Sequence, residues 1–116
     1  MCIRDRIPTL DDLLNLVAGR VPLILEIKSE NREPGPFETT IAGQLANYSG
    51  EAALMSFNPG TVAAIARAAP VRPRGLISYA YNDDSARGNM SSIQRWSRRN
   101  LLPIIMTSAD LSLIHI

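Results

Sequence analysis

An acidic and a basic residue two positions apart, Glu26 and Lys28, stand at the end of an apolar run that begins at Val21. Such a run is typical of a parallel strand that is buried on both faces and delivers polar groups at its carboxyl end. Because side chains alternate between the faces of a strand, Glu26 and Lys28 share a face and project together, roughly 6–7 Å apart. In an α/β barrel, catalytic and metal-binding groups occupy this position.

A purely structural role for the same two residues stays open. A carboxylate at the end of a buried strand costs several kcal/mol, to order of magnitude, unless a cation or a hydrogen-bond donor compensates it. Glu26 and Lys28 would then pair with each other, or with a neighbouring strand, and close the sheet. Weaker candidates for ligand contacts are Arg32 and the adjacent Asp83 and Asp84, for which we favour solvated-loop and turn roles.

The elements that must position Glu26 and Lys28 alternate between helical and strand patterns. Thr9 is the expected N-cap of the first helix, with Asp12 completing a capping box, and Asn58 and Pro59 open a later helix. In the last helix we expect Met90, Ile93 and Trp96 to point inward. The patterns predict helices over residues 10–18, 37–48, 59–69 and 91–100, and strands over residues 21–29, 52–57, 75–79 and 102–107.

Repeated strand–helix units of this length imply a parallel sheet with right-handed crossovers. The pattern fits about four strands of a (β/α)8 (TIM) barrel or a doubly wound sheet, and by itself does not separate them. The sequence contains no glycine-rich dinucleotide motif and no P-loop, which are the usual signs of a nucleotide-binding doubly wound sheet.

The two ends of the chain resemble translations of the two strands of a transposon end that serves as a sequencing adaptor. We therefore interpret residues 1–6 and 111–116 as adaptor-derived, and residues 7–110 as an internal part of a longer protein. Cys2 and His115, the single cysteine and the single histidine, fall in these ends and are excluded from site arguments.

Charge and hydropathy narrow the range of partners. The formal net charge of the chain is +1, and residues 7–110 alone are neutral, so the sequence shows no electrostatic footprint for nucleic acid. No apolar run approaches the ~20 residues that span a bilayer, so we expect no transmembrane segment. The oligomeric state and the compartment stay open.

Several short motifs, in order and spacing, resemble the middle of a bacterial-type glycerophosphodiester phosphodiesterase. The resemblance covers nearly all of residues 7–110. The residues that carry it are Ile7-Pro8-Thr9-Leu10, the strand that ends in Glu26-Ile27-Lys28, Ser56-Phe57-Asn58-Pro59, Ala69-Pro70 and Arg74-Gly75-Leu76.

The resemblance implies a (β/α)8 barrel that uses a divalent cation, Mg²⁺ or Ca²⁺, to hydrolyse glycerophosphodiesters to glycerol 3-phosphate and an alcohol in lipid metabolism. It implies that Glu26 is a metal ligand and that Lys28 is a catalytic cation on the phosphate side. Phe57 would line the site or pack in the core. Asn58 stands where the family often has aspartate, which a helix cap accepts equally.

The family's His-Arg-Gly strand, Glu-x-Asp pair and second histidine are missing from the chain, and the resemblance places them before Ile7. We therefore expect the parent protein to be a phosphoric diester hydrolase and this central fragment to be inactive. Two alternatives remain: another TIM-barrel enzyme, for example one that forms a Schiff base through Lys28, and a small α/β interaction module without catalytic activity.

Overall fold

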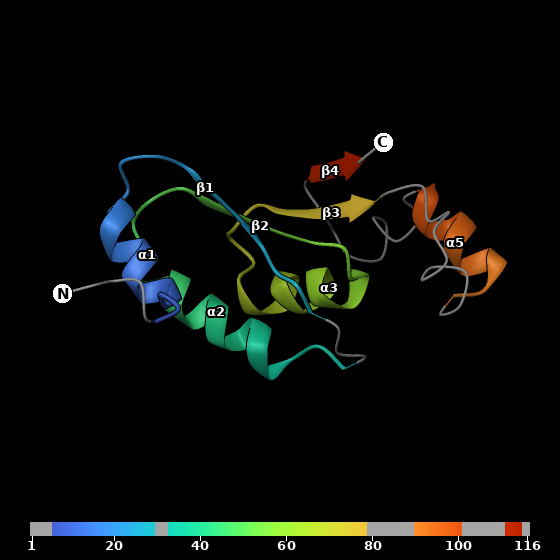
Figure 1. Ribbon diagram of the computed structural model, residues 1–116, viewed down its shortest axis with the longest axis horizontal. Helices are drawn as coiled ribbons and strands as arrows, with labels where there is room; N and C mark the ends of the chain where they lie inside the picture. Colours follow the sequence, from blue (N-terminus) through green and yellow to red (C-terminus); the bar gives the residue numbers. More distant parts are fainter. Residues whose placement is uncertain (1–5, 30–32, 79–89, 101–110, 115–116) are drawn as a thin grey trace.

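The computed structural model describes residues 6–29, 33–78, 90–100 and 111–114. Helices and strands alternate along this part of the chain, as the sequence patterns predict (Figure 1). The elements, in chain order, are α1 (Leu10–Val17), β1 (Leu23–Glu26), α2 (Pro36–Ala46), β2 (Ala52–Ser56), α3 (Pro59–Ala68), β3 (Arg74–Ser78), α5 (Ser92–Arg99) and β4 (Leu111–Ile114).

The strands form a parallel sheet in the order β1-β2-β3-β4, so each strand pairs with the next one along the chain. The first three strands confirm the expected α/β organisation. The fourth expected strand, residues 102–107, lies outside the described residues. The strand beside β3 is instead β4, which falls within the stretch 111–116 that we interpret as adaptor-derived.

Local sequence chemistry explains where the helices begin. The Thr9 hydroxyl accepts a hydrogen bond from the Asp12 backbone N–H at 3.1 Å, and the Asp12 carboxylate accepts one from the Thr9 N–H at 2.9 Å. This confirms the predicted capping box. The Asn58 side chain caps α3 by accepting from the Gly60 N–H at 2.9 Å, with Pro59 as the first helical residue, also as predicted.

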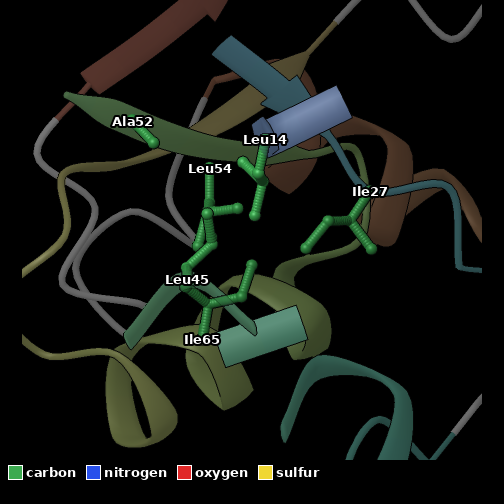
Figure 2. Packing of buried hydrophobic residues seen from close by; sticks show 6 residues of the cluster. All are labelled: Leu14, Ile27, Leu45, Ala52, Leu54 and Ile65. Carbon is green, nitrogen blue, oxygen red and sulfur yellow. The ribbon is translucent and has the colours of Figure 1, made fainter. Parts of the chain in front are cut away.

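The core lies between the sheet and the helices α1, α2 and α3, each of which contributes one buried side chain to it. Figure 2 shows these three side chains meeting those of β2 and of the residue that follows β1. Because alternate residues of a strand share a face, all three helices pack against the same face of the sheet. The buried residues of the cluster are Leu14, Ile27, Leu45, Ala52, Leu54 and Ile65.

The opposite face of the sheet differs between its middle and its edge. Met55 of β2 and Ile77 of β3 are buried there, whereas Ile24 of β1 is 70% exposed and Glu26 is exposed. The prediction that the first strand is buried on both faces is therefore wrong. Within the described residues β1 pairs on one side only, with β2, so it has less cover than a central strand.

The last helix also departs from its prediction. Ile93 and Trp96 of α5 do not point inward, because they are 79% and 61% exposed. In Figure 1, α5 lies at one end of the molecule, away from α1, α2 and α3. The predicted helix is confirmed as α5, but no described element covers Ile93 and Trp96.

Candidate functional site

Glu26 is the last residue of β1, and Lys28 follows two residues later. Both side chains are exposed. Between them, Ile27 turns into the core beside the helices, as Figure 2 shows. By alternation, Glu26 and Lys28 then belong to the opposite face, at the carboxyl end of the strand. The structure thus places both residues where the sequence analysis expects a site.

The described residues do not neutralise this pair of charges. Neither Glu26 nor Lys28 makes an ion pair within the described part of the chain. In a fully buried strand, an unpaired Glu26 carboxylate would destabilise the fold. Because Glu26 is exposed to water, this cost does not arise. Both charged groups are therefore solvated where the structure describes them.

The Glu26 carboxylate is a suitable ligand for a divalent metal ion, but the described residues supply too few further ligands. Hard divalent cations take six or more oxygen ligands, of which a carboxylate supplies one or two. Among the described residues no group of three or more His, Cys, Asp or Glu side chains is arranged to hold a metal. Glu26 can be one ligand, and the described residues alone do not form a metal centre. Arg32, Asp83 and Asp84 lie outside them.

The loop that follows β2 holds the backbone on which Glu26 and Lys28 stand. The buried Ser56 hydroxyl donates to the Ile27 carbonyl at 2.7 Å and accepts from the Asn58 N–H at 3.1 Å. The Asn58 side-chain amide donates to the Ser29 carbonyl at 3.5 Å. Ile27 is also held through its N–H, which donates to the Met55 carbonyl at 2.7 Å.

A second polar group lies nearby and was not anticipated. Glu38, in the first turn of α2, is only 2% exposed. Its two carboxylate oxygens accept hydrogen bonds from the Gly35 N–H and the Thr61 hydroxyl, each at 2.8 Å. Burial by itself raises the pKa of Glu38, but the hydrogen bonds from its own backbone, Thr61, Gly35 and Ser29 outweigh burial and lower it. Glu38 thus ties the loop after β1 to α3.

From sequence alone, Glu38 looked like any acidic residue that favours a helix N-terminus. Its partner Thr61 is 23 residues away, and no local pattern joins them. The alternation of α2 with α3 predicts that the two helices are neighbours, but it does not predict which polar side chains meet. A glutamate in the first helical turn, opposite a threonine in the first turn of the next helix, is the signal that could have found the pair.

Replacing Glu38 by glutamine should lower the free energy of unfolding by about 2 kcal/mol near neutral pH, because a buried charged acceptor is lost. The folded-state pKa of Glu38 lies below its ordinary value of 4.5, so this contribution is present above about pH 4.5 and is lost as the pH falls through the folded-state pKa. Urea denaturation at pH 7 and in acid measures the difference between the two proteins.

Glu51→Gln, a change of an exposed glutamate, is the matched control and should behave like the unmodified chain. Equal stability losses for Glu38→Gln at neutral and at acidic pH would contradict the assignment. In that case the loss would come from packing rather than from the carboxylate.

Two hollows on the described part of the chain lie away from Glu26 and Lys28. One of about 500 Å³ is open to solvent between α1 and α2, and is lined by Asp11, Asn15, Gln44 and Tyr48 among others. The other, of about 240 Å³, lies between the ends of α2 and α3. Neither is lined by a residue of the candidate site.

Comparisons with protein-family models, with curated proteins and with solved structures find no match for this chain. In the described part of the chain, no helix is long and apolar enough to cross a bilayer.

Proposed function

We propose that the chain is the central part of a (β/α)8 barrel and that the parent protein hydrolyses glycerophosphodiesters with the help of a divalent cation. One observation carries the proposal. Glu26 and Lys28 are exposed together at the carboxyl end of β1, on the face of the sheet opposite α1, α2 and α3. A barrel keeps its catalytic groups at this end of its strands.

The topology is compatible with a barrel, and the resemblance is what favours a barrel over a doubly wound sheet. A doubly wound sheet reverses its strand order and carries helices on both faces. Here the strand order is sequential, and three successive helices contribute to one core on one face. Sequential order with helices on a single side fits part of a barrel, and it also fits one half of a doubly wound sheet, before its strand order reverses. The face that is open at β1 would then be turned toward the barrel interior.

The residue types suit phosphodiester hydrolysis. When bound, a divalent cation polarises a phosphoryl oxygen. Glu26 would contribute one carboxylate to holding that cation, and the remaining ligands would come from the segment that the resemblance places before Ile7. The compact ammonium of Lys28 would stabilise the negative charge that develops on the phosphoryl oxygens. Lys28 is the single lysine of a chain with eleven arginines. Lysine carries a compact point charge, whereas arginine carries a planar, delocalised one, so the two are not equivalent in such a role.

The proposal is tested by extending the reading frame into the genomic DNA upstream of Ile7 and producing the longer protein. We expect an in-frame His-Arg-Gly strand, a Glu-x-Asp pair and a second histidine. In that protein, Glu26→Gln should lower the Mg²⁺-dependent hydrolysis of glycerophosphocholine by at least about 100-fold, since even partners outside the first ligand shell contribute about 10–100-fold.

Glu51→Gln is again the control and should keep activity within about twofold, because Glu51 is exposed at the start of β2, at the opposite end of the strands. An upstream sequence without these motifs, or full activity in Glu26→Gln, would remove the phosphodiesterase assignment. The interaction-module alternative would then be the better account of the chain.

A further inference from the structure

The last residue of β2, Ser56, holds a backbone carbonyl at the centre of the candidate site. The Ile27 carbonyl, which accepts from the Ser56 hydroxyl at 2.7 Å, belongs to the residue between Glu26 and Lys28. The Ser56 side chain is 1% exposed, so water does not compete for this bond. The same hydroxyl oxygen accepts from the Asn58 N–H, which fixes the direction of the Ser56 proton toward Ile27.

We propose that Ser56 is a positioning residue that sets the direction of the Glu26 and Lys28 side chains by fixing the Ile27 peptide group. The effect on a catalytic site rests on the proposed function, whereas the hydrogen bond itself does not. The Lys28 side chain leaves the backbone directly after that peptide group, and Glu26 lies one residue before Ile27, so a rotation of the peptide group would turn Lys28 relative to Glu26. β1 ends at Glu26, and one more cross-strand bond follows it, from the Ile27 N–H to the Met55 carbonyl. The hydrogen bond from the Ser56 hydroxyl to the Ile27 carbonyl, which we call the clamp, holds the chain at this point.

The clamp also explains the order of residues at this point in the chain. Ser56 ends β2, and Asn58 caps α3 two residues later. Asn58 also reaches the Ser29 carbonyl at 3.5 Å. The carbonyls before and after Lys28 are therefore both held from the same loop. The segment Ser56–Asn58 thus both caps α3 and holds the residues that follow β1.

The test compares the chain with Ser56→Ala by NMR, using ¹⁵N-labelled protein. Amide order parameters at Glu26 and Lys28, near 0.85 for a rigid backbone, should fall toward the value of about 0.6 that marks flexibility. Ile65→Val, which removes one buried methylene from α3, is the control for a general loss of stability. It should leave the order parameters at Glu26 and Lys28 unchanged.

A second readout uses Mn²⁺ as a paramagnetic probe of the Glu26 carboxylate. Selective broadening of the Glu26 amide should need about tenfold more Mn²⁺ in Ser56→Ala than in the unmodified chain or in Ile65→Val. If Ser56→Ala does not fold, Ser56→Cys keeps a side chain of similar length with a weaker donor, and should give a smaller change in the same direction.

The outcomes separate the two proposals. Unchanged order parameters and an unchanged Mn²⁺ requirement in a folded Ser56→Ala protein would overturn the positioning role and leave the proposed function standing. A second outcome is that the order parameters fall in Ser56→Ala while Mn²⁺ does not selectively broaden the Glu26 amide signal of the unmodified chain. This outcome would support the positioning role and would remove Glu26 as a metal ligand.

Discussion

Replacing Leu54 by alanine should lower the free energy of unfolding by about 3–4 kcal/mol. The Leu54 side chain is fully buried at the centre of β2. Figure 2 shows it pointing toward Leu45 of α2, with Leu14 of α1 beside it. Truncation would remove contacts to several elements at once and would leave a cavity that the sheet backbone cannot close. Urea denaturation followed by circular dichroism measures the change.

Leu16→Ala is the matched control for Leu54→Ala. The Leu16 side chain is 69% exposed on α1, and both leucine and alanine favour a helix. We expect its stability to change by less than about 0.5 kcal/mol. Similar losses for the two variants would mean that the cluster around Leu54 is not the core of the chain.

Replacing Arg72 by alanine should cost about 2–3 kcal/mol, because one guanidinium serves three backbone carbonyls. Arg72 donates to the Leu45 carbonyl at 2.9 Å, to the Gly50 carbonyl at 2.8 Å and to the Tyr48 carbonyl. These carbonyls lie in the last turn of α2 and just after it, where backbone acceptors lack helical partners. A cation there also opposes the negative end of the helix dipole.

Arg72→Lys separates the charge of Arg72 from its geometry. Lysine keeps the positive charge, but it has no planar fork that can reach several carbonyls, so we expect an intermediate loss. Arg67→Ala, an exposed arginine in the last turn of α3, should cost less than about 1 kcal/mol. A loss for Arg72→Ala no larger than that for Arg67→Ala would contradict the capping role. Thermal or urea unfolding decides between these results.

Much of the fold could be predicted because its signals are local. The Thr9 and Asp12 capping box and the Asn58 cap depend on residues two or three positions apart, and the strand–helix alternation depends on periods of two and 3.6 residues. Glu26 lies at the end of a strand as predicted, because its position follows from the apolar run before it, whereas the strand is shorter than the predicted 21–29 and Lys28 lies two residues beyond its end.

The parts that could not be predicted depend on contacts between distant residues. Arg72 meets carbonyls 22 to 27 positions earlier, and Glu38 meets Thr61 23 positions later. The exposure of Ile24 and Trp96 depends on whether another element covers them, and an apolar residue looks the same in a buried and in an uncovered position. Periodicity identifies the apolar side of an element but not its partner.

The sequential strand order has a consequence for how the chain folds. Each of β1, β2 and β3 pairs with the strand one unit further along the chain, and the clamp from Ser56 to Ile27 spans 29 residues. Each pairing closes a crossover that contains one helix, which costs less chain entropy than pairing strands from opposite ends of the chain. Each strand–helix unit can dock on the one before it as it leaves the ribosome, so assembly can follow the direction of synthesis.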